Sequence, residues 1–321
     1  VANIIFLDQP AGTGFSYAKT AEDYKCSGTL SANLTYHFLI KWLINNPKYL
    51  NNPLYIAGGS YSGITVPLVV DQVYNGIEAG SQPQLNIKGY ILGNPFTDMY
   101  GKLGEYNGRI GYAHRMGLLS DELYMSAKEN CHGDYLNVDP DNDSCNEDLQ
   151  RVTQCLEKIY TFHILEPQCG PLLLDMPPYA RRFLQSAAAP LLVESWCRYT
   201  NMIYSKKWAN TELVQKALHI RERTIIEWAR CNETIKENIF IYDVSSTVDY
   251  HKKFTQKHCR ALIFSGDHDM GAPHTVTEEW INSLKLEIGS KWRPWFVEDQ
   301  IAGYTTAYFH SGYELMYATV K

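Results

Sequence analysis

The sequence lacks an excess of basic residues, which excludes one large class of partners. Asp and Glu number 35 against 29 Lys and Arg, and the formal net charge is -6. A nucleic-acid-binding protein needs a basic face to neutralise phosphates, so we expect no nucleic-acid partner. Apolar runs long enough to span a bilayer are also missing, and we expect no membrane span. The composition, with 45% hydrophobic and 20% charged residues, is that of a globular protein.

Paired C-x-x-C motifs are absent as well, although the chain contains 8 cysteines. Zinc sites favour such pairs, so the cysteines indicate disulfides in an oxidising compartment, with buried free thiols in a cytosolic enzyme as the alternative. We therefore expect no metal and no other cofactor. Eight cysteines allow about 105 full pairings, and one bridge is predicted between Cys131 and Cys145, which bracket a polar loop. The remaining cysteines are Cys26, Cys155, Cys169, Cys197, Cys231 and Cys259.

Three Asn-x-Ser/Thr acceptors for N-linked sugars begin at Asn33, Asn142 and Asn232. They support an origin in the secretory pathway, and we expect a secreted or vacuolar protein. The chain begins with Val1 inside an apolar run, without a signal peptide. Because we expect the true N-terminus to lie upstream of Val1, this absence says nothing about destination.

Strands and helices alternate in the first part of the chain, which predicts a mostly parallel sheet with helices on its faces. The predicted elements are a buried strand Val1–Leu7, a helix Leu30–Leu43, a strand Pro53–Ala57, a helix Ile64–Tyr74 and a strand Leu85–Leu92. Pro67 is placed in the first turn of the second helix, where proline is tolerated.

The pattern changes between residues 96 and 258, where helical segments alternate with cysteine-rich and proline-rich loops. We expect an inserted, mainly helical region here, and a core formed by residues 1–95 and 259–321. The sheet resumes with a strand Arg260–Ser265. A helix Thr275–Leu286, strands near Trp295 and Tyr304, and a last strand Leu315–Val320 follow.

The sharpest chemical signal is the segment Gly58–Gly63, between a predicted buried strand and a helix. A serine on such a turn is held in strained geometry with its hydroxyl exposed above the sheet, so Ser60 is the predicted nucleophile. The usual pattern is G-x-S-x-G, and here Ser62 replaces the second glycine. A glycine-rich turn with an incidental serine is the alternative. The backbone N–H of Tyr61, the next residue, would be one oxyanion donor, and the second would come from a loop upstream of Val1.

A serine nucleophile needs a base, oriented by a carboxylate that precedes it in chain order. Asp269 follows a predicted strand at its carboxyl end and is the predicted carboxylate. Asp267 competes with it, and either aspartate could instead cap the next helix.

The histidine is expected just after the last strand, beyond Lys321. His310 precedes that strand and should lie at the opposite edge of the sheet, as a surface or packing residue. His268 and His274 flank Asp269, but no helical His-x-x-x-His accompanies them, which argues against zinc.

With these residues in hand, the chain resembles the serine carboxypeptidase family, of the α/β-hydrolase superfamily, and within it the plant serine carboxypeptidase-like acyltransferases. Segments similar to family motifs occur in family order along the whole chain. They are Phe6–Tyr17, Gly58–Gly63, Ile91–Pro95, Ala113–Leu118, Ala217–Arg221, Gly266–Met270 and Trp292–Trp295.

The resemblance implies an α/β-hydrolase fold in which Ser60 and Asp269 belong to a Ser–Asp–His triad. The histidine would lie in a Gly-Gly-Gly-His or similar run directly after Lys321. The second oxyanion donor would lie in a Gly-Gly-Pro-Gly segment upstream of Val1. The partners implied are a small-molecule glucose ester as acyl donor and an alcohol acceptor, or a peptide C-terminus in the peptidase branch. The oligomeric state stays open.

Gly59 departs from the family pattern. The family places glutamate, in peptidases, or aspartate, in acyltransferases, directly before the nucleophile. In the peptidases this acid helps to bind the terminal carboxylate of the substrate. Gly59 and Asp8 are the predicted substrate-binding positions. Acyl transfer is the first functional hypothesis, serine carboxypeptidase the second, and an inactive or truncated copy the third. The 321 residues by themselves are expected to be inactive.

Overall fold

The computed structural model of the chain describes residues 2–166, 168, 198–225, 227–235 and 239–321. Val1, Cys169 and Cys197 lie outside these residues. Internal contacts divide the chain into two compact units, the first formed by residues 1–26 and 166–241 and the second by residues 27–165 and 242–321. These limits do not coincide with the boundaries expected at residues 95/96 and 258/259. The division into a core and an inserted region therefore stays a prediction.

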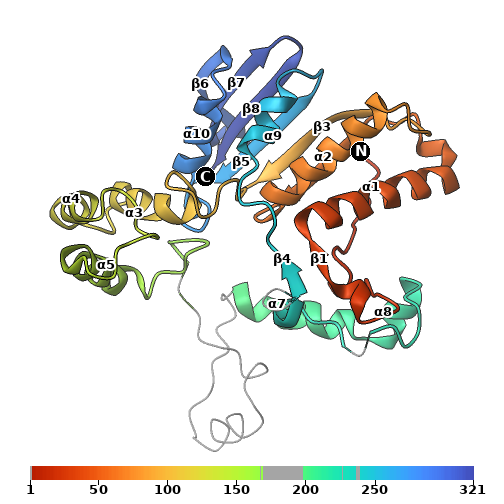
Figure 1. Cartoon of the computed structure of the whole chain (residues 1–321), viewed down its shortest axis with the longest axis horizontal. Helices are drawn as coiled ribbons and strands as arrows, with labels where there is room; N and C mark the ends of the chain where they lie inside the picture. The colour runs from red at the N-terminus through yellow and green to blue at the C-terminus, as the bar shows by residue number, and fades with distance from the viewer. Residues whose placement is uncertain (1, 167, 169–197, 226, 236–238) are drawn as a thin grey trace, which may run out of the picture. The chain divides into compact units, whose positions relative to one another are not determined.

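The second unit is built on a 6-stranded, mostly parallel sheet in the order β2-β3-β5-β8-β7-β6 (Figure 1). The strands are β2 (Leu54–Gly59), β3 (Ile87–Gly93), β5 (Arg260–Gly266), β6 (Glu287–Val297), β7 (Gln300–His310) and β8 (Tyr313–Val320). β2, β3, β5 and β8 are parallel, whereas β7 is antiparallel to both β8 and β6. The predicted α/β class is confirmed, and the carboxyl ends of the four parallel strands lie at one edge.

Helices from separate parts of the chain cover this sheet and form its main apolar core. They are α1 (Gly28–Asn45), α2 (Ser62–Glu78), α9 (Val248–Phe254) and α10 (His274–Ser283), and a short 3-10 turn, η2 (Pro47–Tyr49), follows α1. Ser27 caps α1 by accepting a hydrogen bond from the Leu30 N–H at 3.2 Å. Val70, Leu92 and Ile263 are fully buried in this core. The burial of one stripe of each helix against the strands stabilises the layer.

Pro67 lies further into its helix than the sequence indicated, because α2 begins at Ser62. Proline has no N–H, so Pro67 cannot donate to the carbonyl of Gly63 four residues earlier. That carbonyl accepts a hydrogen bond from the Thr247 hydroxyl at 2.7 Å instead. The fully buried Thr247 thus replaces the helical bond that proline removes.

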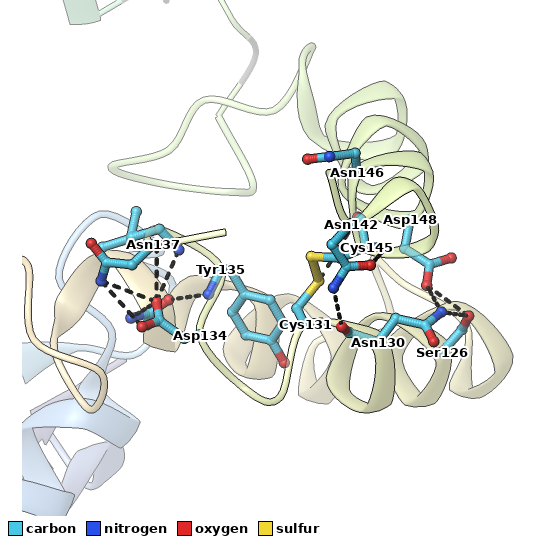
Figure 2. The surroundings of a disulfide bond; sticks show 12 residues. Ser126, Asn130, Cys131, Asp134, Tyr135, Asn137, Asn142, Cys145, Asn146 and Asp148 are labelled. Carbon is cyan, nitrogen blue, oxygen red and sulfur yellow. Dashed lines mark hydrogen bonds between the residues drawn. A yellow bond between two sulfur atoms is a disulfide. The ribbon is translucent and has the colours of Figure 1, made fainter. Parts of the chain in front are cut away.

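Three further helices of the second unit form a smaller apolar cluster: α3 (Glu105–Arg115), α4 (Asp121–Asn130) and α5 (Asp143–Leu156). The predicted disulfide between Cys131 and Cys145 is confirmed, with its Cα atoms 5.0 Å apart (Figure 2). It joins the end of α4 to the start of α5. Beside it, Asp148 of α5 accepts hydrogen bonds from Ser126 and Asn130 of α4 at 2.7 and 2.8 Å. The two helices are therefore held by a covalent and a polar link.

In the first unit the predicted strand Val1–Leu7 is wrong for its described residues. Ala2–Leu7 are not in a strand, and the Phe6 side chain is 90% exposed. An apolar run becomes a buried strand only where neighbouring strands pair with it and helices cover it. The regular elements that the structure describes in this part are η1 (Glu22–Tyr24), α7 (Arg198–Ala209), α8 (Glu212–Ala217) and β4 (Phe240–Ile241), together with β1 (Cys26–Ser27), which ends in the second unit. Among the described residues, no helix is long and apolar enough to cross a membrane.

Candidate active site

Ser60 lies on a sharp turn between β2 and α2, as the sequence predicts. Its φ is 57°, in the left-handed region that a residue with a side chain rarely adopts, and the residue is exposed. Its N–H donates to the carbonyl of Gly93 at 2.9 Å, and its own carbonyl accepts from the N–H groups of Gly63 and Phe96 at 2.9 and 3.0 Å. Bonds on both sides of the residue hold the strained backbone and present its side chain at the edge of the sheet.

Two glycines around Ser60 are required by close packing. A β-carbon at Gly58 would lie 2.3 Å from Cβ of Ser62, and one at Gly63 would lie 2.2 Å from the carbonyl oxygen of Phe96. Both distances are far below any normal contact. Ser62, which replaces the second glycine of the usual pattern, fits because Gly58 leaves room for it.

Gly59 is different, because its environment does not require glycine. It is exposed, and a β-carbon there would meet only the Gly93 carbonyl oxygen, at 3.3 Å. A side chain at this position therefore requires only a small shift of that one backbone carbonyl.

Tyr61 occupies the N-cap position of α2, directly after Ser60. Backbone N–H groups at the start of a helix lie at the positive end of the helix dipole, where they stabilise negative charge. The Tyr61 ring meets that of Tyr242 edge-on at 5.8 Å, and burial raises the pKa of its phenol above the usual range. The position fits the oxyanion role predicted for the Tyr61 N–H.

Asp269 lies in the loop after β5, partly buried. Its Oδ1 accepts hydrogen bonds from the N–H groups of Gly271 and Ala272 at 2.6 and 3.1 Å. Burial raises the pKa of the Asp269 carboxyl, and these two N–H groups, Arg109 and Asn94 partly oppose that rise. The N-cap of α10 is Pro273, so Asp269 does not cap that helix.

Arg109 and Asn94 are site residues that the sequence did not single out. The Arg109 guanidinium donates to the carbonyl of Gly271 at 3.1 Å and lies 4.2 Å above the Tyr106 ring. It thereby holds the loop that carries Asp269 and places a positive charge near the carboxylate. Asn94, at φ 42°, accepts from the Gly266 N–H at 3.2 Å through its side chain. Its position directly after a predicted strand, at the edge where Ser60 lies, was the feature of the sequence that could have identified Asn94.

The sheet brings Ser60 and Asp269 to the same edge. Ser60 directly follows β2. Asn94 follows β3, and its N–H donates to the carbonyl of Phe264 in β5 at 2.8 Å. Asp267 follows β5, and its N–H donates to the carbonyl of Val320 in β8 at 2.9 Å. Phe96 and Ala272 belong to one apolar cluster, against which Tyr61 packs. The nucleophile turn and the aspartate loop therefore share a common support. The carboxyl end of β8, at Val320 and Lys321, lies at this edge too.

The histidines of this region are arranged as follows. His310 ends β7 opposite Tyr313, at the amino end of β8, which is the edge opposite Ser60, as predicted. His268 contacts the Asp267 carboxylate through Nδ1 at 2.6 Å, so Asp267 pairs with its neighbour. His274 begins α10, and burial lowers its pKa.

Within the described ranges, no group of three or more His, Cys, Asp or Glu side chains is arranged to hold a metal ion.

The remaining predicted positions are Asp8 and the three asparagines of the glycosylation acceptors. Asp8, in the first unit, accepts a hydrogen bond from the Phe15 N–H at 2.9 Å and shapes the turn at Gly14. Asn33 lies half-buried in the second turn of α1. Asn142 caps α5, and its Nδ2 donates to the Asn130 carbonyl at 2.9 Å. Asn232 is exposed. The glycosylation of these three asparagines and the substrate contact of Asp8 stay predictions.

The sheet order and the strained serine turn define the class of protein, an α/β-hydrolase. A solved structure supports the fold: Kex1(delta)p, described as a prohormone-processing carboxypeptidase from Saccharomyces cerevisiae, superposes with a TM-score of 0.71 over 98% of this chain and 68% of its own, at 16% identity. The sequence profile described as serine carboxypeptidase (Peptidase_S10) matches residues 1–321.

Curated plant relatives agree with that profile. Serine carboxypeptidase-like 8 and serine carboxypeptidase-like 16 of Arabidopsis thaliana are 41% and 42% identical over all 321 residues, which cover 68% and 67% of the two relatives. The chain thus spans about two thirds of the length of these relatives. It belongs to the serine carboxypeptidase family.

Proposed function

We propose that the full protein containing these residues transfers an acyl group from a 1-O-glucose ester to an alcohol acceptor, with Ser60 as the covalent carrier. The observation that supports this most directly is the exposed Ser60 on a left-handed turn, at the same sheet edge as Asp269. A nucleophile held in place at the same sheet edge as a carboxylate is an arrangement that acyl-serine chemistry uses.

In the first half-reaction, Ser60 Oγ attacks the ester carbonyl, and its proton passes to a histidine that we place after β8 in the full protein. Asp269 stabilises the resulting cation, and the Tyr61 N–H stabilises the oxyanion. The glucose oxygen leaves with that proton, and an acyl-serine remains. In the second half-reaction the acceptor alcohol gives its proton to the histidine and attacks the acyl-serine. The bond from the acyl carbon to Ser60 Oγ breaks, and the histidine returns that proton to Ser60 Oγ.

Gly59 departs from both branches of the family, because the acyltransferases that the chain resembles also carry an acid, aspartate, at this position. Its lack of an acid counts most directly against carboxypeptidase activity. The peptidases of the family that the chain resembles use an acid at this position to bind the terminal carboxylate of a peptide, and Gly59 offers no such group. The Tyr242 ring, which meets the Tyr61 ring edge-on at 5.8 Å, belongs to a residue that is 49% exposed and suits an aromatic acyl group. Carboxypeptidase activity shares the acyl-serine and remains the alternative, because only the acceptor differs.

The compartment proposed for the protein is the secretory pathway, ending outside the cell or in the vacuole. The Cys131–Cys145 disulfide supports it, because such bonds persist mainly in oxidising compartments.

The function is tested by incubating the full protein with a phenolic 1-O-glucose ester and an alcohol. We expect a new ester, an acyl adduct on Ser60 detectable by mass spectrometry, and loss of both in Ser60→Ala. Ser62→Ala is the matched control, because it removes a hydroxyl from the same turn and should retain turnover. Release of C-terminal amino acids from peptides without ester formation would favour the carboxypeptidase.

An inactive copy is the third possibility and has its own test. We propose that the 321 residues expressed alone do not react, because removing a base or an oxyanion donor costs on the order of several kcal/mol of transition-state stabilisation. Rapid stoichiometric labelling of Ser60 in that chain by a fluorophosphonate would contradict this. Absence of labelling in the full protein would identify an inactive copy.

A further inference from the structure

Glu105 is a buried carboxylate close to the nucleophile turn. It is 1% exposed and occupies the first position of α3. Its Oε1 accepts hydrogen bonds from the N–H and the hydroxyl of Thr97 at 2.7 and 2.8 Å, and its Oε2 accepts from the Asp98 N–H at 3.2 Å. Burial raises the pKa of the Glu105 carboxyl, and these three donors, with the Glu105 N–H at the start of α3, partly oppose that rise.

The segment that Glu105 holds makes further bonds to the nucleophile turn. The Thr97 carbonyl accepts from the Thr247 N–H at 2.8 Å. The Thr247 hydroxyl donates to the Gly63 carbonyl at 2.7 Å, the acceptor that Pro67 leaves without a helical partner. Thr97 and Thr247 are both fully buried, so water does not compete for these bonds.

Two amides complete the connection to the nucleophile. The N–H of Phe96, directly before Thr97, and the N–H of Gly63 both donate to the Ser60 carbonyl, at 3.0 and 2.9 Å. Ser60 keeps its left-handed backbone only while its surroundings fix it there. A continuous series of hydrogen bonds, which runs through the buried Thr97 and Thr247, therefore joins Glu105 to the backbone of Ser60.

We propose that Glu105 is a positioning residue for the Ser60 nucleophile, acting through Thr97, Phe96 and Thr247. Its carboxylate fixes the segment 96–98, and that segment fixes the carbonyl of Ser60. Glu105 touches no reacting atom. Its effect is to keep Ser60 Oγ in the geometry for attack, where a displacement of about 1 Å costs on the order of 100-fold in rate. The consequence for the reaction rests on the proposed function, whereas the hydrogen-bonded coupling does not.

The coupling is tested by hydrogen exchange of the full protein, observed at the amides of Gly63 and Phe96. In Glu105→Gln, the side-chain N–H₂ group of the glutamine faces a backbone donor. The backbone amides of Gly63 and Phe96 should then exchange about tenfold faster or more. Thr97→Val, which removes only the hydroxyl, should show the same effect more weakly, and Thr97→Ser should restore protection. Glu122→Gln is the matched control, because Glu122 is exposed in the first turn of α4. Unchanged exchange in both Glu105→Gln and Thr97→Val would overturn the proposal.

The kinetic consequence is measured separately. Relative to the wild type, Glu105→Gln and Thr97→Val should lower kcat for ester transfer about 10- to 100-fold with KM nearly unchanged, and Thr97→Ser should recover it. A folded Glu105→Gln with normal kcat would contradict the positioning role. If the wild type itself does not react at Ser60, the proposed function fails, and the exchange measurement still decides whether Glu105 holds the turn. Thr97→Val keeps the test available should Glu105→Gln not fold.

Discussion

Gly63 lies directly against Phe96: a β-carbon at Gly63 would stand 2.2 Å from the Phe96 carbonyl oxygen. The same two residues donate their N–H groups to the carbonyl of Ser60. The first turn of α2 and the loop after β3 are therefore packed backbone to backbone around the nucleophile. Space at this contact, as much as the serine itself, decides which residues the turn accepts.

We expect Gly63→Ala to destabilise the protein and Gly59→Ala to leave it nearly unchanged. The first adds a methyl group where backbone atoms already touch, which costs about 1–3 kcal/mol or more. The second meets only the Gly93 carbonyl, at 3.3 Å. Thermal unfolding of the two variants beside the wild type measures the difference. Equal losses of stability would show that the packing at Phe96 relaxes freely.

An acid at position 59 should move the enzyme toward peptidase chemistry. Gly59→Glu adds a carboxyl group directly before Ser60, in a place with room for a side chain. When protonated it can donate a hydrogen bond to the terminal carboxylate of a peptide, so the gain should appear at acidic pH and disappear as pH rises. We expect about a tenfold rise in kcat/KM for peptide release. Gly59→Gln, which donates at every pH, is the control. An unchanged rate of peptide release in both variants would show that the residue at position 59 does not determine which substrate the enzyme uses.

Removing the charge of Arg109 should restrict activity to higher pH. Burial raises the pKa of Asp269, and the Arg109 guanidinium opposes that rise. In Arg109→Met the carboxyl therefore stays protonated to a higher pH, and the acidic limb of the pH–rate profile should move upward. Arg109→Lys keeps the charge but loses the two-pronged contact with Gly271. It should retain the acidic limb while kcat falls about tenfold. Coincident pH profiles for the two variants would rule out an electrostatic effect on Asp269.

His251 makes the folded state sensitive to acid. It is fully buried, its Nδ1 lies 2.7 Å from the Tyr90 hydroxyl, and burial lowers its pKa to about 3. The unfolded chain binds this proton near the ordinary value of 6.5, so the contribution is fully present above about pH 6.5 and is lost as pH falls toward 3. The free energy of unfolding that His251 contributes changes by about 1.4 kcal/mol per pH unit at most.

Denaturant unfolding of the wild type and His251→Phe between pH 4 and 7.5 should measure this contribution. The stability of the wild type relative to the variant should decrease as pH falls. Parallel pH dependences would show that His251 is not the group responsible.

Local pattern predicted a large part of the site. The glycines around Ser60, the strand before it and the helix after it are contiguous, so the left-handed turn could be predicted from adjacent residues. Asp269 followed in the same way from its place after β5. Arg109 could not be found like this, because its partner Gly271 lies 162 residues away in the chain and no local pattern links them.

The α/β order, the serine turn and the Cys131–Cys145 bridge were all predicted from the sequence and are present in the structure, since each depends on residues close together in the chain. Long-range packing, in contrast, determines that Ala2–Leu7 is not a strand and that β7 and β6 extend the sheet in the antiparallel direction. It also determines that Glu105, Thr97 and Thr247 converge on the carbonyls of Ser60 and Gly63. A buried polar group takes its partner from whatever the fold places within about 3 Å, and that placement depends on the packing of distant segments rather than on the residues beside it.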